Sequence, residues 1–74
     1  MQSSKSNYYK IIAKNIKILR KSRKLSQESF AETIACSREY ISRLENSREK
    51  ISLAMLLNIS EIYNIPPESF FKNS

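Results

Sequence analysis

Apolar residues recur at helical spacing along most of the chain, and short polar clusters separate the apolar runs. Between Tyr8 and about Arg23, Ile12, Ile16 and Leu19 follow the i, i+4, i+7 spacing of a helix with one buried face. The lysines of this segment lie mostly off that stripe. The pattern therefore predicts a first amphipathic helix, preceded by a polar, Ser-rich segment, residues 1–7, that we expect to be a flexible arm.

The stretch from Ser26 to Asn46 contains two short helical patterns separated by a tight turn at Ala35 and Cys36. Apolar residues share one face of each helix: Phe30, Ala31 and Ile34 in the first, and Ile41 and Leu44 in the second. This is the helix-turn-helix pattern, in which the second helix enters the major groove of DNA. The simpler alternative is a pair of packed helices with a polar outer face.

Three helix starts share one local device. Ser26, Ser37 and Ser52 each stand where a side-chain oxygen would accept a hydrogen bond from an otherwise unpaired backbone N–H. Each serine is preceded by an apolar residue, and another apolar residue follows four places into the helix, which is the spacing of a hydrophobic staple. We therefore expect three helices to begin immediately after these serines.

The last part of the chain predicts two more helices. Residues 52–63 are apolar over most of the helix circumference, with Leu53, Leu56 and Tyr63 as one stripe, so the helix is either central or meets another subunit. Asn64 suits a left-handed stop, and Pro66 and Pro67 suit the end of one helix and the start of the next, which would span 67–71. The sequence thus predicts one all-α domain of five helices, residues 8–74.

The outer face of the second motif helix supplies the candidate site. At 100° per residue, with Ile41 and Leu44 pointing inward, the residues near the middle of that helix point outward. We expect base contacts from Ser37, Arg38, Glu39, Ser42 and Arg43. Residues at the border of that face, at the start of the preceding helix and in the following loop would hold phosphates, and they are Gln27, Tyr40, Asn46, Arg48 and Lys50. The alternative for each arginine is a solvated charge or a phosphate contact without sequence information.

Charge is distributed unevenly along the 74 residues, whose formal net charge is +6. Residues 1–27 contain eight Lys or Arg and no acid, whereas the rest contains five basic residues and seven acids. A basic half beside a balanced half fits a surface that meets a polyanion, with nucleic acid as the first candidate and an anionic membrane as the second.

Other site classes find little support in the composition. The chain has one cysteine and no histidine, which excludes an internal disulfide and the usual zinc sites, so we expect no metal or cofactor and interpret Cys36 as a small apolar residue. No apolar run approaches a membrane span. Neither a Gly-rich phosphate loop nor a nucleophile–base constellation occurs, so we expect a cytoplasmic protein that is not an enzyme and has no small-molecule ligand.

Four segments together resemble a known family. They are the Ile16, Leu19 and Arg20 group, LSQESFAE at 25–32, SREYISRLEN at 37–46 and NIPPESFF at 64–71. The chain resembles the Cro/C1-type (XRE-family) helix-turn-helix regulators of phage repressors and restriction–modification controllers. This resemblance implies a five-helix, lambda-repressor-like domain that binds double-stranded DNA as a homodimer, and an ion pair between Arg20 and Glu45.

The resemblance has one departure, because members of that family commonly place glycine after the first helix, in the motif's turn and after the LEN segment. This chain contains no glycine and has Lys24, Ala35 and Ser47 there. If these positions still require positive φ, each costs about 1 kcal/mol. An adjusted turn, with a slightly different tilt of the second motif helix, is the alternative.

Two functions follow from these observations. The first is a sequence-specific transcription regulator that occupies a near-palindromic operator as a homodimer formed through the fourth and fifth helices, and that blocks or recruits polymerase. The second is a protein-interaction module, such as an antitoxin or an anti-repressor, that binds its partner through the apolar fourth helix. Sequence-selective DNA binding distinguishes the first from the second.

Overall fold

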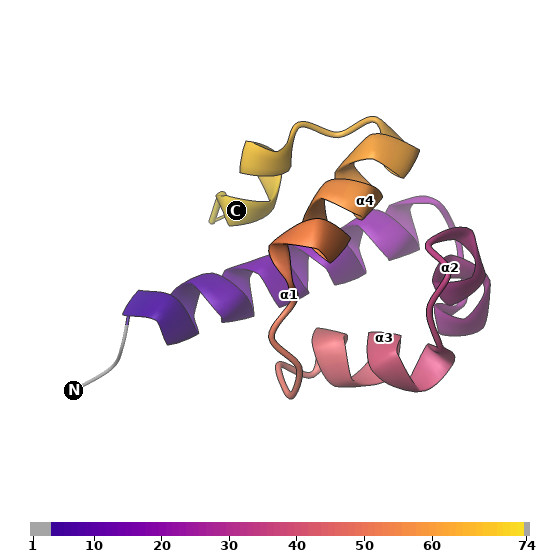
Figure 1. The fold of residues 1–74 in the computed structure, drawn as a ribbon, viewed down its shortest axis with the longest axis horizontal. Helices are drawn as coiled ribbons and strands as arrows, with labels where there is room; N and C mark the ends of the chain where they lie inside the picture. Colours follow the sequence, from indigo (N-terminus) through magenta and orange to yellow (C-terminus); the bar gives the residue numbers. More distant parts are fainter. Residues whose placement is uncertain (1–3, 74) are drawn as a thin grey trace.

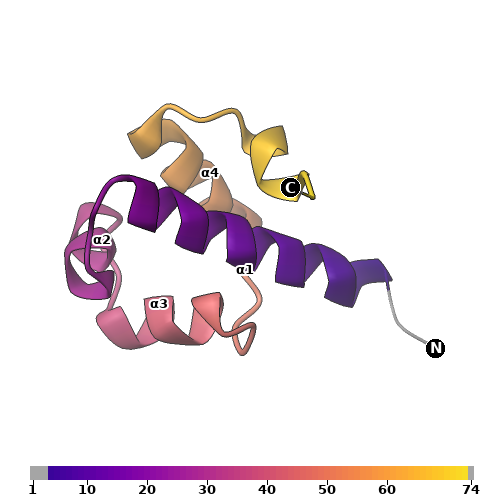
Figure 2. The same ribbon diagram turned by 180° about the vertical axis from the view of Figure 1, so that it is seen from behind.

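The computed structural model describes residues 4–73, with side chains from Asn7 onward, and it is all-helical in this range. The elements in chain order are α1 (Ser4–Ser22), α2 (Gln27–Thr33), α3 (Arg38–Glu45), α4 (Leu53–Tyr63) and the 3₁₀ helix η1 (Pro67–Phe71). In Figure 1, α1 crosses the molecule behind α4, while α3 runs along the lower edge and α2 closes one end. Seen from behind, α1 lies between α3 and the pair formed by α4 and η1 (Figure 2).

The expected count of five α-helices is wrong, because the last helical segment is a 3₁₀ turn. Its bounds are those expected, but five residues starting after Pro66 form i→i+3 bonds, such as Ser69 N–H to the Pro66 carbonyl at 2.9 Å. Neither proline has an N–H to donate, and the segment is too short for a stable α-helical ladder. Residues 4–73 therefore contain four α-helices and one 3₁₀ helix.

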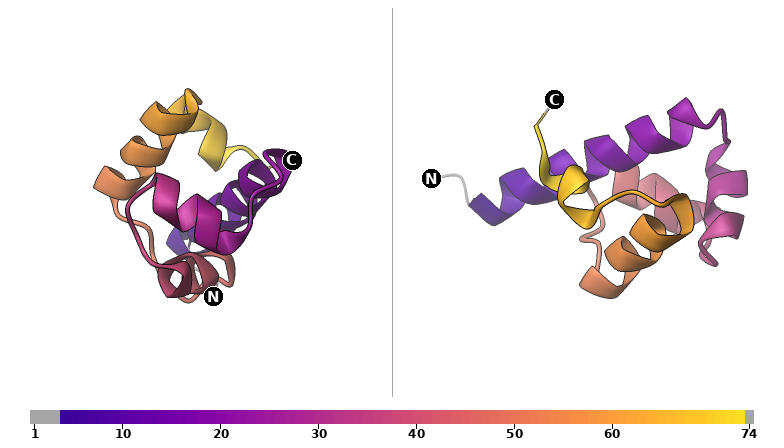
Figure 3. Two further views of the ribbon diagram at one scale, coloured as in Figure 1. Left: turned by 90° about the vertical axis from the view of Figure 1, so that its right-hand side faces the viewer. Right: turned by 90° about the horizontal axis from the view of Figure 1, so that it is seen from above.

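The first helix begins at Ser4, earlier than the apolar stripe indicated. Residues 4–7, which we expected in a flexible arm, belong to this helix, and they contain neither proline nor glycine, the residues that most oppose a helix. The remainder of the expected arm, residues 1–3, lies outside the described residues. Viewed from above, the first turns of α1 extend past the other elements (Figure 3).

The three expected helix starts are confirmed. The hydroxyl oxygens of Ser26, Ser37 and Ser52 accept hydrogen bonds from the backbone N–H three residues later, at 3.0, 3.1 and 3.1 Å. Each serine has extended backbone angles, as an N-cap requires. Short-range sequence signals therefore determine where α2, α3 and α4 begin.

All four α-helices end in the same way, with a left-handed residue followed by a hydrogen bond back across the last turn. The four residues have φ between 55° and 61° and are Lys24, Ala35, Ser47 and Asn64. In each case the following N–H reaches a carbonyl five residues earlier, for example Cys36 N–H to the Ala31 carbonyl at 2.9 Å. The turns are therefore not adjusted to the lack of glycine, and three of them carry a residue that disfavours this conformation.

The hydrophobic core is formed by side chains on the inward faces of all five elements. Its fully buried large side chains are Phe30, Ile16, Ile34, Ile41, Leu44 and Ile59. Of the two aromatics in η1, Phe70 is buried in this core and Phe71 is exposed. The expected stripe of α4 is corrected at Leu53, which is 69% exposed, because Leu56, Ile59 and Ser60 form the buried face.

Candidate nucleic-acid interface

The third helix holds its outer face away from the protein because two residues anchor the opposite face. Ile41 and Leu44 are almost fully buried, in contact with the core that α1 and α2 build. Arg38, Glu39 and Arg43 are exposed on the other side, as the helical angles predicted. In Figure 1, α3 forms the lower edge of the molecule, with its outer side open along its length.

The start of α3 combines a structural and an outward-facing role. Ser37 is exposed, and its hydroxyl oxygen accepts the Tyr40 N–H, while its O–H remains able to donate outward. Ser42, in the middle of the helix, is only partly exposed and accepts a bond from Asn46 Nδ2 through its backbone carbonyl at 2.8 Å. Ser42 is therefore less exposed than Arg38 and Arg43.

Both arginines of this face have carboxylate neighbours. An Arg38 Nη2 nitrogen lies 3.5 Å from Glu39 Oε2, and both side chains are more than half exposed. Arg43 donates through Nε to Glu49 Oε1 at 3.1 Å. Ion pairs this exposed contribute about 0–1 kcal/mol to stability, so neither pair is needed for the fold.

The residues expected at phosphates are placed in different ways. Arg48 and Lys50 are exposed in the loop after α3, and the Lys50 ammonium lies 5.7 Å from the centre of the Tyr9 ring, beside α1. The Asn46 amide folds back on its own helix through the bond to Ser42. The Gln27 amide points inward and donates through Nε2 to Glu45 Oε1 at 3.1 Å. Arg48 and Lys50 are therefore the exposed charges at the edge of α3, with the Lys50 ammonium turned toward α1.

Tyr40 lies at the border of the face, as the angles indicated. Its side chain is half-buried against the core. Burial raises the pKa of its phenol, and the nearby Glu49 carboxylate raises it further. The hydroxyl therefore keeps its proton and can donate a hydrogen bond.

The structure contains the ion pair between Arg20 and Glu45, which links α1 to α3. Arg20 Nε and Nη2 donate to the two Glu45 carboxylate oxygens at 2.7 and 3.2 Å, and Nη1 donates to the Leu25 carbonyl at 2.7 Å. The Glu45 side chain is only 2% exposed. With Gln27 as a further donor, this network fixes the last turn of α3 against α1 and the start of α2.

Two features escaped the sequence reasoning. Glu49 reaches Arg43 from a loop, and no helical spacing rule covers a partner six residues away beyond the end of the helix. Asn15 donates through Nδ2 to the carbonyls of Phe70 and Lys72 at 2.8 and 2.9 Å, and so ties the C-terminal segment to α1. An Asn inside an amphipathic helix was the only signal for the second contact.

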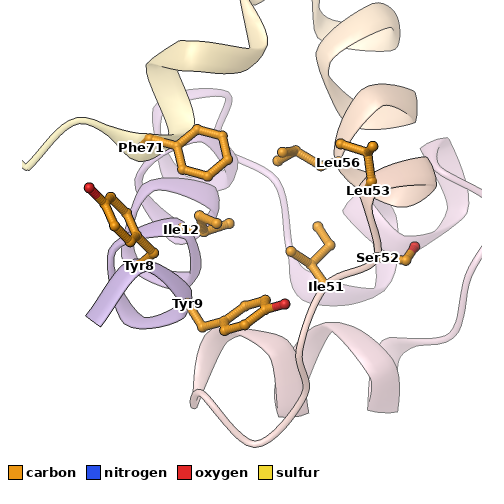
Figure 4. A pocket seen from close by; sticks show the side chains of 8 residues that line it. All are labelled: Tyr8, Tyr9, Ile12, Ile51, Ser52, Leu53, Leu56 and Phe71. Atoms are coloured by element: carbon orange, nitrogen blue, oxygen red, sulfur yellow. The ribbon is translucent and has the colours of Figure 1, made fainter. Parts of the chain in front are cut away.

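An apolar groove lies on another side of the molecule, between the start of α1, the start of α4 and η1 (Figure 4). It encloses about 280 Å³. Tyr8 and Phe71 form one wall, with their ring centres 6.2 Å apart in an edge-on arrangement, and Leu53 and Ile51 face them.

None of the helices in residues 4–73 combines the length and hydropathy needed to cross a membrane.

Comparisons with known proteins agree with this geometry. A family model described as helix-turn-helix matches residues 16–70, which is more than half of the chain. The antitoxin PezA of Streptococcus pneumoniae serotype 4 is 38% identical over 55 residues, which are 74% of this chain and 35% of that protein. The chain thus spans about a third of the length of this curated relative.

A solved structure shares the fold. The crystal structure of the hypothetical transcription factor NHTF from Neisseria matches with a TM-score of 0.82, at 19% identity, over 97% of this chain and 83% of that one. At this identity the match concerns the arrangement of the helices alone. The family match, together with the exposed face of α3, leads to one conclusion: the chain belongs to the Cro/C1-type helix-turn-helix family of DNA-binding regulators.

Proposed function

We propose that this protein is a sequence-specific regulator of transcription that binds a near-palindromic operator as a homodimer. The observation that carries the proposal is the orientation of α3, in which Ile41 and Leu44 are buried while Arg38 and Arg43 are exposed. A guanidinium can donate two parallel hydrogen bonds to O6 and N7 of guanine. Bound near a promoter, the dimer would block polymerase or recruit it.

Within this proposal, the side chains of α3 and of the segments beside it divide into two roles. Arg38 and Arg43 read guanines, Glu39 accepts from a cytosine amino group, and Ser37 and Ser42 make shorter-range contacts to base edges. Arg48 and Lys50 neutralise phosphates, and Gln27, Tyr40 and Asn46 contribute polar contacts at the rim. Because Gln27 and Asn46 are engaged within the protein, their contribution requires their amides to turn outward.

The dimer is proposed to form through the exposed apolar side chains around the groove. Leu53 is 69% exposed and Leu57, one turn later on the same side of α4, is 45% exposed, while Tyr8 and Phe71 lie exposed across the groove. A monomer rarely leaves such a set of neighbouring apolar groups in water. A twofold dimer would place its two α3 helices in successive major grooves about 34 Å apart.

Selection of bound sites from a randomised duplex pool tests the DNA-binding part. Two symmetric half-sites about one helical turn apart are expected, and binding should weaken steeply as salt rises. Arg38→Ala should cost about 1–3 kcal/mol of binding free energy and relax preference at one base pair, whereas the matched variant Arg48→Ala should weaken binding to all sequences alike. Equal losses on all sequences for Arg38→Ala would contradict base reading by this residue.

Sedimentation equilibrium tests the dimer. Leu57→Ser should weaken self-association, because the substitution removes apolar area from the proposed interface. Ile62→Ser is the matched control, since Ile62 is also 45% exposed but lies on the opposite side of α4 from Leu53. A wild-type protein that stays monomeric at micromolar concentration on its selected operator would refute the dimer.

The likeness to PezA favours a second candidate, in which the chain is the protein-interaction module of an antitoxin. In that case its apolar α4 surface would meet a toxin rather than a second copy. Gel shifts with random genomic fragments separate this candidate from the first when they show no sequence-selective band, because a pure interaction module has no preferred site.

A further inference from the structure

The two arginines on the outer face of α3 differ in which nitrogen their carboxylate neighbour occupies. Arg38 is near Glu39 through a terminal nitrogen, Nη2, at 3.5 Å. Arg43 instead donates through Nε to Glu49, at 3.1 Å. The Glu49 side chain is 34% exposed and makes the shorter contact, whereas Glu39 is 66% exposed. The contact with Glu49 therefore engages the Nε atom of Arg43 and leaves the two terminal nitrogens of its guanidinium outside this contact.

This arrangement suits one mode of base recognition. Guanine is read by two parallel N–H donors that reach O6 and N7 in the major groove. A guanidinium engaged at Nε can present its two terminal nitrogens as that pair of donors. We propose that Glu49 is a positioning residue that holds Arg43 for guanine reading and thereby raises the sequence discrimination of the interface. The inference rests on the proposed function.

The backbone explains why Glu49 reaches this place. Ser47 adopts the left-handed conformation, and the Arg48 N–H bonds back to the Arg43 carbonyl at 2.8 Å. The chain therefore reverses at the end of α3 and runs beside its last turn. This reversal brings the side chain of Glu49 next to Arg43, on the side of the helix that also carries Tyr40.

The negative charge of Glu49, like its hydrogen bond to Arg43, favours contact of Arg43 with a base edge over contact with a phosphate. Its carboxylate accepts from Arg43 Nε, and, after burial, its negative potential is the next cause that raises the pKa of the Tyr40 phenol. A carboxylate at the edge of a DNA-binding face also repels phosphates. For Arg43, contact with a backbone phosphate becomes less favourable than contact with a base edge, because the phosphate would have to approach Glu49.

The test measures discrimination in a double-mutant cycle. Dissociation constants are measured for the selected operator and for an operator altered at one base pair, the pair at which Arg43→Ala relaxes the preference. The ratio is the constant for the altered operator divided by the constant for the selected operator. Glu49→Ala should lower the ratio of the two constants by about threefold to tenfold, and should have no effect on that ratio in the Arg43→Ala background. Glu61→Ala, which removes an exposed carboxylate from α4, should leave the ratio unchanged.

Glu49→Gln separates positioning from charge, because its amide oxygen can still accept from Nε. It should keep most of the discrimination that Glu49→Ala loses. The inference is overturned when Glu49→Gln and Glu49→Ala lower the ratio equally, or when Glu49→Ala changes affinity for all sequences alike, as Glu61→Ala would. A wild-type protein that does not distinguish the two operators would instead refute the proposed function itself.

Discussion

Removal of Arg20 should destabilise the domain far more than removal of any other arginine in residues 7–73. Arg20→Ala leaves the Glu45 carboxylate almost entirely buried with the Gln27 amide as its remaining side-chain donor, and it also strips the donor from the Leu25 carbonyl. Breaking a buried ion pair by removing one partner costs about 3–5 kcal/mol, because an uncompensated charge stays buried. A domain of this size has a total stability near the lower end of about 5–15 kcal/mol.

The assay is urea and thermal unfolding followed by circular dichroism. A loss of about 3 kcal/mol corresponds to a fall in Tm of at least about 12 °C for a domain of this length. Arg43→Ala is the matched control, because its ion pair is exposed, and its Tm should stay close to that of the wild type.

A second variant keeps the reasoning testable even where Arg20→Ala does not fold. The double variant Arg20→Met, Glu45→Leu removes both charges. It should be more stable than the single variant Arg20→Met, because no buried carboxylate remains without its ion-pair partner. A free energy of unfolding for Arg20→Ala within about 1 kcal/mol of the wild-type value would refute a stabilising role for the Arg20–Glu45 pair. A double variant less stable than Arg20→Met alone would refute it equally.

Three other predictions concern local features. Ala35→Gly should raise stability by about 1 kcal/mol in urea unfolding, because φ is 59° there, whereas Asn64→Gly should change it little, since Asn tolerates this region. Ser52→Ala should lower stability by about 1 kcal/mol through loss of the bond to the Met55 N–H, and an unchanged midpoint would rule out a role for this cap. Burial raises the pKa of the Cys36 thiol, so the folded protein should react with a thiol reagent more slowly than the urea-unfolded chain at the same mildly alkaline pH. Equal labelling rates in the folded and the unfolded protein would contradict the raised pKa of Cys36. The same shift means that the free energy of unfolding falls as pH rises through the raised pKa.

Local rules determined much of the fold from the sequence alone. The serine caps, the apolar faces of the motif helices and the left-handed stop at Asn64 depend on residues within one or two turns of each other, so spacing along the chain was enough to find them. The outer face of α3 followed in the same way, because two buried positions on a helix determine the direction of the others.

Contacts between distant segments were decided only by the tertiary structure. The sequence pattern of α4 did not show which of its apolar sides faces the core, and packing into that core and against η1 buried Leu56 and Ile59 while leaving Leu53 exposed. The approach of Glu49 to Arg43 depends on how the chain reverses after α3, and the inward turn of Gln27 depends on where the Arg20–Glu45 pair sits. Sequence periodicity reports on one element at a time, whereas these contacts depend on the relative positions of several elements.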